Sequence, residues 1–325
     1  MKHSEARGAA GSLALAGLWL LVGAGCASLP SPPPARTAVE RRGRHVLRIA
    51  TGCGCHGANF AGWRQGGPDR LPEAAPYGER FVGPDGVVPA PNITPDPDTG
   101  IGGWSDDEIT QALRNGIRPN GEQLSALMPF RAYHGMAESD LAALVAYLHR
   151  LRPVRNQVPA RQLSQPLTEP GPGREEQGAP APAQPPENGI ALGRYLVQHV
   201  CTCTDCHLPR GAADPDRLIG QRLPVGPGRS VPVPDITPDR ETGIGRWSES
   251  AIARYLRTGS RPDGGLAQSL MAGLILTSYE HLTRDEARAI ATYLKSIPPA
   301  RRPSSSPASQ AGGSRHLPEE RARGG

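Results

Sequence analysis

Residues 203–207 read CTDCH, a Cys-x-x-Cys-His run around which the rest of the chain is organised. Such a run is the attachment signature of haem c. The thiols of Cys203 and Cys206 are spaced to form thioether bonds with the two vinyl groups of a haem, and His207 follows where it can bind the iron. A bare Cys-x-x-Cys pair also occurs in zinc sites and redox dithiols. Haem is favoured because no second Cys/His pair with zinc spacing follows.

A long internal repeat supports this interpretation. The block PNITPDPDTGIGGW at 91–104 returns as PDITPDRETGIGRW at 234–247, which is an offset of 143 residues. The same offset brings Met128 onto Met271, after which the second copy gains three residues. Self-similarity at a fixed period indicates a repeated structural unit. We therefore expect two copies of one fold.

The composition favours loop-rich domains joined by linkers. The 325 residues include 40 glycines and 36 prolines, whereas aromatic residues make up only 4%. This balance argues against one large sheet core, and a haem would supply apolar surface of its own. The net charge is +5, but the basic residues are scattered and extend into the tails. We expect a mildly basic, solvated surface and no nucleic-acid partner.

The N-terminus is typical of an exported bacterial protein. Two basic residues precede an apolar run at 13–22 that is short for a membrane span. Small residues and then Cys26 follow, which is similar to a lipoprotein signal whose cysteine becomes the lipidated first residue. Gly23 stands where that signal usually has leucine, so ordinary cleavage and an uncleaved anchor stay open. Each reading predicts export, which haem c attachment outside the bacterial cytoplasm requires.

Changes in composition and the extent of the repeat divide the chain into six parts. The prediction is a signal peptide (1–25), a Pro-rich spacer (26–39), a first unit (40–155), a Pro/Gly/Ala-rich linker (156–187), a second unit (188–299) and a disordered tail (300–325).

The sequence pattern of each unit predicts a small helical domain. Short helices at 43–50 and 193–200 lead into the cysteines. Ser105 and Glu108 have the spacing of a capping box at the start of a further helix. The clearest helix closes each unit, with apolar side chains spaced along one face: Leu141, Leu144, Val145 and Leu148, then Ala287, Ile290, Ala291 and Leu294.

An opening helix, a haem motif, loops, a methionine and a closing amphipathic helix make up the layout of class I cytochromes c. The two copies resemble di-haem cytochromes c that serve as electron-transfer subunits of periplasmic alcohol, aldehyde and sugar-acid dehydrogenases. The ITPDxxTGIGxW block and the R-P-(N/D)-G loop carry this resemblance, which covers residues 40–299. It implies an all-α fold of two tandem class I cytochrome c-like domains and two haems c.

In the second unit, Cys203 and Cys206 are the expected thioether anchors and His207 the proximal iron ligand. Met271 lies between the Arg-Pro loop and the last helix, where this family carries its axial methionine, and a methionine ligand raises the potential of a haem. A methionine is more often core filler, but its matched position in both copies favours ligation. Met136 aligns with a leucine and is expected in the core.

The first unit departs from the pattern. It reads CGCH at 53–56, one residue short between the cysteines, although both thiols keep a counterpart when the copies are aligned. We expect a bound haem with His56 as proximal and Met128 as distal ligand. Three outcomes stay open for its attachment. Both Cys53 and Cys55 form thioethers, only Cys55 attaches, or both thiols stay free and the haem is held by His56 alone or lost.

For some other residues the sequence allows two interpretations of their role. Trp104 and Trp247 are expected against the haems, either with the indole N–H on a propionate or as apolar contacts. Arg118 and Arg261 either offset propionate charge or face water. Cys201 is an extra thiol. Some histidines match no histidine in the other copy and have no predicted role: His45, His149 and His199.

The expected function is electron transfer. The carrier would take electrons from a periplasmic or membrane dehydrogenase and pass them to another cytochrome, an oxidase or a quinone site, anchored to the membrane if Cys26 is lipidated. Neither copy contains an acid–base pair or a nucleophile motif, so no enzyme is expected. Two alternatives are a di-haem peroxidase, which must open one distal position, and a mono-haem carrier whose first domain is a haem-free docking module.

Overall fold

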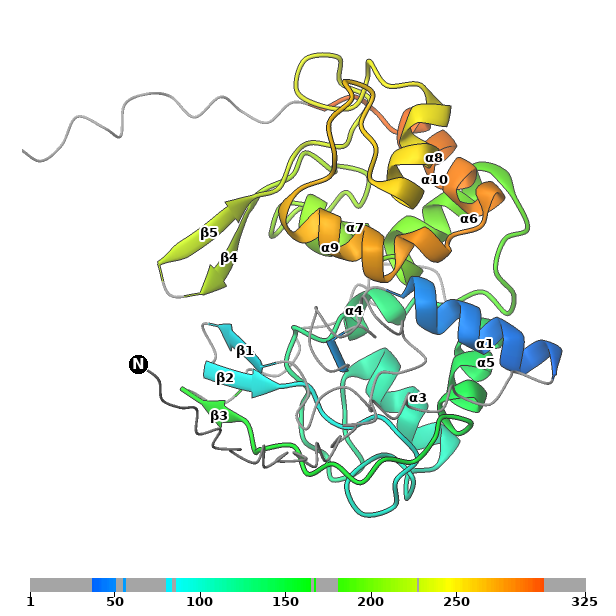
Figure 1. Ribbon diagram of the computed structural model, residues 1–325, viewed down its shortest axis with the longest axis vertical. Coiled ribbons are helices and arrows are strands. Elements are labelled where there is room, and N and C mark those ends of the chain that lie inside the picture. Colours follow the sequence, from blue (N-terminus) through cyan, green and yellow to red (C-terminus); the bar gives the residue numbers. More distant parts are fainter. Residues whose placement is uncertain are drawn as a thin grey trace, which may run out of the picture. The chain divides into compact units, whose positions relative to one another are not determined.

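A computed structural model describes residues 37–50, 55–56, 80–83, 86–164, 167, 181–226 and 228–300. In these residues helices are the main regular structure, with a few short strands (Figure 1). The predicted signal peptide, most of the spacer, Cys53 and nearly all of the tail lie outside them. Within the described ranges, no helix combines the length and the apolar character needed to cross a bilayer.

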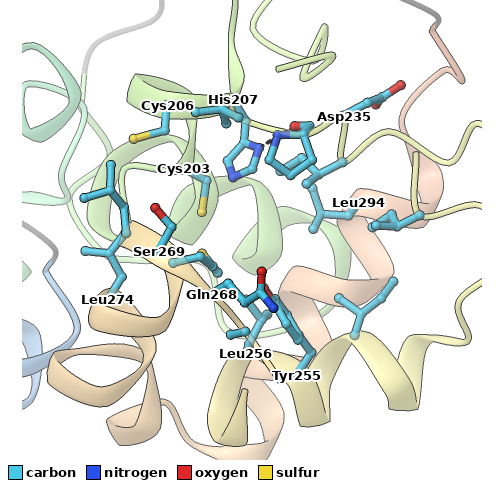
Figure 2. Close-up of a pocket in the computed structure, with 18 of the residues that line it drawn as sticks. Cys203, Cys206, His207, Asp235, Tyr255, Leu256, Gln268, Ser269, Leu274 and Leu294 are labelled. Atoms are coloured by element: carbon cyan, nitrogen blue, oxygen red, sulfur yellow. Dashed lines mark hydrogen bonds between the residues drawn. The ribbon is translucent and has the colours of Figure 1, made fainter. Parts of the chain in front are cut away.

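The N-terminal half (37–164) and the C-terminal half (181–300) run through similar series of elements. The first contains α1 (Ala38–Ile49), β1 (Arg80–Gly83), β2 (Gly86–Pro89), α3 (Asp106–Asn115), α4 (Phe130–Tyr133), α5 (Glu138–Leu148) and β3 (Gln162–Leu163). The second contains α6 (Gly189–Tyr195), the π-helical turn η4 (Leu196–Val200), α7 (Cys203–His207), β4 (Arg222–Gly226), β5 (Arg229–Pro232), α8 (Glu249–Thr258), α9 (Ser269–Thr277), the 3-10 turn η5 (Tyr279–His281) and α10 (Arg284–Ser296). In each half the helices border a cavity, seen for the C-terminal half in Figure 2.

The start of α3 confirms the predicted capping box. The Ser105 side chain accepts a hydrogen bond from the Glu108 N–H, and the Glu108 carboxylate accepts one from the Ser105 N–H. Helix α8 keeps the serine cap, at Ser248, without the returning carboxylate. Both helices end at a glycine in the left-handed conformation, which has no Cβ penalty there: Gly116 and Gly259.

A glycine sets how closely the first and last helices of each half approach. Helix α1 packs on α5, and α6 packs on α10. A Cβ at Gly43 would lie 1.9 Å from the Ala143 carbonyl oxygen, and one at Gly193 would lie 2.0 Å from the Ala289 carbonyl oxygen. No larger residue fits without moving the helices apart, so these matched glycines fix both crossings.

Strands appear where the sequence indicated only loops and a linker. The antiparallel hairpins β1–β2 and β4–β5 lead into the two copies of the matched block. Strand β3, within the predicted linker, pairs with the free edge of β2. Further along this segment, the carbonyls of Pro182 and Ala183 accept hydrogen bonds from the first N–H groups of α5. These carbonyls stand in for a side-chain cap that α5 lacks.

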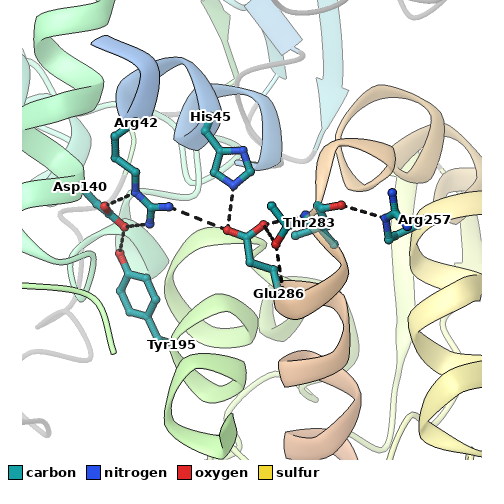
Figure 3. A network of polar contacts seen from close by, with 8 residues as sticks. Arg42, His45, Asp140, Tyr195, Arg257, Thr283 and Glu286 are labelled. Atoms are coloured by element: carbon teal, nitrogen blue, oxygen red, sulfur yellow. Dashed lines mark hydrogen bonds and ion pairs between the residues drawn. The ribbon is translucent and has the colours of Figure 1, made fainter. Parts of the chain in front are cut away.

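The two halves are joined by a reciprocal polar network (Figure 3). Asp140 and Glu286 occupy matched positions in the first turns of α5 and α10. The Tyr195 hydroxyl of α6 donates to Asp140 at 2.7 Å, while His45 Nε2 of α1 lies 2.7 Å from Glu286. Because His45 and Tyr195 are also matched in the repeat, each half gives a side chain from its first helix to the last helix of the other.

Arg42 strengthens this network from α1. Its Nε and Nη2 atoms each lie 2.7 Å from an oxygen of the Asp140 carboxylate, and Nη1 lies 3.8 Å from Glu286. Asp140 is 1% exposed and Glu286 is 7% exposed. Burial by itself would raise the pKa of Glu286, but the hydrogen bond and charge of His45, with the donors of Thr283, outweigh it and lower that pKa. Buried carboxylates require such partners, so the network ties the halves together.

Replacing Gly43 by alanine is expected to destabilise the protein. The new Cβ would overlap the Ala143 carbonyl, and such overpacking costs about 1–3 kcal/mol of unfolding free energy. Chemical denaturation of the purified holoprotein measures this. Gly103→Ala is the control, because its Cβ would meet nothing within 4 Å and its φ is not left-handed. Equal stability of the two variants would contradict the helix crossing.

Replacing Glu286 by glutamine is expected to reduce the dependence of stability on acid pH. A carboxyl whose pKa is lowered by folding stabilises above its unfolded pKa, and that stability is lost as pH falls through the folded value. Wild-type unfolding free energy should therefore drop more steeply below pH 4.5, the reference value of a glutamate, than that of the variant. The exposed Glu187→Gln serves as control and should follow the wild type. Parallel curves for Glu286→Gln and wild type would refute this role.

Candidate haem-binding cavities

The cavity of the C-terminal half brings together every predicted site residue of the second unit. It has a volume of about 430 Å³, within the range of pockets that bury a cofactor-sized ligand. Cys203, Cys206 and His207 reach it from α7 (Figure 2), and Met271 of α9 lines the same space. Much of the remaining lining is apolar and includes Ile236, Ile244, Trp247, Leu256, Leu274 and Leu294.

The His207 ring is held in the form that binds metals. Its Nδ1 lies 2.9 Å from the carbonyl oxygen of Pro234. A carbonyl only accepts, so Nδ1 carries the proton and Nε2 keeps its lone pair. Burial lowers the pKa of His207, and this outweighs the opposing effects of the Pro234 carbonyl and Asp235. A neutral imidazole oriented by a backbone carbonyl is the usual state of a metal-bound histidine.

The two thiols are neutral in this environment. Burial raises the pKa of Cys203 to about 12 and that of Cys206 to about 11. A reactive dithiol works as a thiolate, which this surrounding disfavours. In the described ranges no three His, Cys, Asp or Glu side chains gather as they would around a metal ion. The donor set of two thiols, one imidazole and one thioether in an apolar cavity fits haem c.

Backbone strain is concentrated at this cavity. Among the described residues, the non-glycine positions with positive φ are Thr202 (49°) and Ser269 (56°), and both line the cavity. Such a φ is unfavourable, above all for a β-branched residue. Thr202 directly precedes Cys203, and Ser269 lies two residues before Met271. The strained positions therefore adjoin the elements that carry the predicted anchors and distal ligand.

Tyr279 and Cys201 support the segment that enters α7. The Tyr279 hydroxyl donates to the Cys201 carbonyl at 2.7 Å and lies 4.0 Å from the Cys203 sulfur. The Cys201 side chain is 1% exposed, and burial raises its pKa. It forms no disulfide with another described cysteine. The extra thiol thus belongs to the core beside the cavity.

A second cavity, of about 560 Å³, lies in the N-terminal half. Cys55, His56 and Met128, three of the residues expected at a first haem site, line this cavity. His56 Nδ1 lies 2.8 Å from the Pro91 carbonyl oxygen, and Pro91 is the repeat counterpart of Pro234. Burial likewise lowers the pKa of His56 against the effect of this carbonyl. Cys53 lies outside the described residues, so its attachment stays a prediction.

Matched positions line the two cavities. Besides the two methionines, several residue pairs separated by 143 positions have one member in the lining of each cavity. They include Val88 and Val231, Ile93 and Ile236, Ile101 and Ile244, Trp104 and Trp247, Ile109 and Ile252, Leu113 and Leu256, and Arg118 and Arg261. The two cavities are therefore two copies of one site.

Polar residues of the matched block hold together the loop that contributes Thr242 to the second cavity and Thr99 to the first. Asp239 accepts hydrogen bonds from the Thr242 N–H and hydroxyl. In the first copy Asp96 accepts the corresponding two hydrogen bonds from Thr99. Thr94 exchanges hydrogen bonds with the backbone of Val154, beyond α5. Thr237 exchanges the corresponding pair with Ala300, beyond α10. These residues close a loop against the chain that follows the last helix.

The methionines differ in local structure. Met271 lies in the first turn of α9, whereas Met128 precedes the four-residue α4. Helix α9 has nine residues and begins two residues before Met271, whereas α4 has four and begins two residues after Met128. Met136 is 0% exposed in the core, which confirms its predicted place.

Sequence reasoning missed residues outside the haem motif. His45 binds Glu286, and His199 Nδ1 lies 3.1 Å from the Ala132 carbonyl oxygen. Both histidines link the two halves. Arg161, from the predicted linker, lines the first cavity. The matched acids at the start of the two closing helices, Asp140 and Glu286, were the available signal for the contacts between halves.

No protein-family model matches the chain. It is 32% identical over 299 residues to the cytochrome c subunit of a quinone alcohol dehydrogenase from Gluconacetobacter polyoxogenes, covering 84% of this chain and 58% of that subunit. It is 32% identical over 282 residues to the gluconate 2-dehydrogenase cytochrome c subunit of Pantoea cypripedii, covering 81% of this chain and 60% of that one. The chain thus spans 58–60% of the length of these dehydrogenase subunits.

A third relative has nearly the same extent as this chain. The diheme cytochrome c-type protein of Cereibacter sphaeroides is 32% identical over 307 residues, with 87% of this chain and 97% of the relative covered. Its similarity runs through both copies of the repeat and both cavities. The chain therefore belongs to the di-haem c-type cytochrome family, to which the cytochrome c subunits of quinone alcohol and gluconate dehydrogenases are related.

Proposed function

We propose that this protein is a di-haem electron carrier with one haem c in each cavity. The single observation that carries the proposal is the duplicated site. In both halves a histidine with its Nδ1 on a proline carbonyl shares an apolar cavity with cysteine and methionine side chains. Family membership supports the same cofactor.

Each side chain has a proposed role. In the second cavity Cys203 and Cys206 anchor the haem, His207 binds the iron from the proximal side and Met271 from the distal side. In the first cavity His56 and Met128 take the two axial roles, and Cys55 forms a thioether together with Cys53. Each of these residues belongs to one of two units, 40–155 and 188–299, which we propose to be tandem class I cytochrome c-like domains joined by the linker 156–187.

The bound haem supplies reversible one-electron chemistry. The protein holds it rigidly, keeps water away through the apolar lining and leaves no distal position open. No acid–base pair or nucleophile is needed for this task. Methionines in both cavities argue against peroxidase activity, which requires an open distal position. The retained first cavity argues against a haem-free docking module.

The partners and the location follow from relatives and from the N-terminus. The related alcohol and gluconate dehydrogenase subunits belong to redox enzymes, so we propose a periplasmic or membrane dehydrogenase as electron donor. The acceptor would be another cytochrome or an oxidase. We further propose export to the periplasm and a lipid anchor on Cys26, because the first 26 residues are similar to a lipoprotein signal.

Redox titration of the purified holoprotein tests the proposed function. Two reversible one-electron waves are expected, and neither reduced haem should bind carbon monoxide because methionine fills the distal position. A high-spin haem that binds carbon monoxide, together with peroxide turnover, would instead favour the peroxidase. The titration requires protein from a host with haem c maturation.

Removing the distal methionines one at a time is expected to open one haem at a time. Met271→Ala should let one haem per chain bind carbon monoxide and should lower one midpoint potential, because the thioether that raises it is lost. Met128→Ala should act on the other haem. Met136→Leu is the control and should leave both haems unchanged, since it replaces a core methionine at similar volume. Closed haems in both alanine variants would exclude these ligands.

A further inference from the structure

We propose that Arg161 and Arg118 form a two-arginine site at the first cavity that binds a haem propionate and raises the midpoint potential of the first haem. This inference rests on the proposed function. Arg161 comes from the segment that follows α5, and Arg118 from the Arg-Pro loop after α3. Both side chains line the first cavity. Repeat comparison assigns no counterpart to Arg161 among the described residues of the other half.

The two guanidinium groups converge on one carboxylate. Arg118 Nη1 lies 3.6 Å from Glu122 Oε2, and Arg161 Nη2 lies 3.4 Å from the same oxygen. The Arg118 and Arg161 side chains are 30% and 24% exposed, whereas that of Glu122 is 46% exposed. Two cations thus share one half-exposed anion, and all three side chains line the cavity. Among the described lining residues these three leave one positive charge in excess.

The electrostatics of Arg118 agree with this surplus. Burial is the largest influence and lowers its pKa; Glu122 opposes this, and the neighbouring charge of Arg161 adds to the lowering. Two like charges held together in a partly buried place are favourable only when anions balance them. A haem propionate is a carboxylate, and an arginine fork binds carboxylates in a bidentate manner. A propionate would therefore supply a second anion to Arg118 and Arg161, which share the one carboxylate of Glu122 among the described lining residues.

The C-terminal half shows the balanced version of this site. Arg261, the counterpart of Arg118, lies 2.6 Å from Asp263 and shares this carboxylate with no second arginine among the described residues. The counterpart of Glu122 is Gly265. Arg261 is the one arginine or lysine among the lining residues of the second cavity. The surplus positive charge thus distinguishes two cavities that are otherwise closely matched.

The fold positions Arg161 through the strand that follows it. Residue 162 opens β3, which pairs with β2 beside the cavity, and Arg161 Nη1 also donates to the Gln123 carbonyl. These contacts explain how a residue of the predicted linker reaches the site. They also define a purely structural role, in which Arg161 only ties the segment to the N-terminal half.

An electrostatic role of Arg161 predicts an effect on the potential of the first haem, whereas a purely structural role predicts none. The oxidised haem carries one more positive charge than the reduced haem, so a nearby cation favours reduction. Charge and hydrogen bonds around a haem are among the means by which proteins set its potential. Arg161 should therefore raise the potential of the first haem relative to the second.

Potentiometric titration of holoprotein variants tests this inference. Arg161→Gln should lower one of the two midpoint potentials and leave the other in place, and Arg161→Lys, which keeps the charge, should recover most of the shift. Arg155→Gln is the matched control. It removes a charge from the same segment at an arginine that is 77% exposed and pairs with Asp98, so both midpoints should stay unchanged. In a Met271→Ala background the midpoint potential of the second haem is already lowered, so the wave that Arg161→Gln shifts can be assigned to the first haem.

Other outcomes would overturn the inference. Unchanged midpoints in Arg161→Gln, with reduced stability toward denaturant, would leave Arg161 as a structural tie alone. Equal shifts of both waves would show a general effect rather than a site at the first haem. A wild-type protein with one haem per chain in the pyridine haemochrome assay would refute the proposed function itself, and this result is distinct from either pattern of midpoints.

Discussion

The hydrogen bond from each predicted proximal histidine to a proline carbonyl is the interaction on which the site depends. It fixes the proton on Nδ1 and leaves Nε2 for the iron, in His56 as in His207. The carbonyl can do this only because the matched block is folded tightly behind it. The need for this tight fold explains why the residues shared by the two copies of the block are mostly turn-forming and hydrogen-bonding. Asp239 and Thr237, for example, hold the loop together through hydrogen bonds to Thr242 and Ala300.

The duplication also determines how the halves meet. Matched residues of the first and last helices, His45 and Tyr195 on one side and Asp140 and Glu286 on the other, form reciprocal contacts across the interface. One apolar core cluster runs through both halves. A carrier with two haems benefits from such a tie, because electron transfer between them requires a stable separation. The differences between the copies are then the places where the two sites can be tuned separately, as at Arg161.

Much of the site was predictable because the chemistry of haem attachment demands particular residues at a particular spacing. The motif at 203–207, the methionine pair and the closing helices all carry strong local signals. The hairpins and β3 were missed, since short strands rich in Gly and Pro read as loops. The contacts between halves were hidden for another reason. The offset between copies is 150 residues at Gly43 and Gly193, 143 in the block and 146 at Asp140 and Glu286, so partners that share a role do not share one spacing.

The central claim is that both cavities hold a covalently attached haem, although the first motif is one residue short. The most direct test is the intact mass of the mature protein, purified from a host with haem c maturation, together with its pyridine haemochrome spectrum. The account predicts the mass of the chain plus two haems. The haemochrome band position would then distinguish one thioether from two at Cys53 and Cys55. A mass corresponding to a single haem, with one haem per chain in the spectrum, would contradict it.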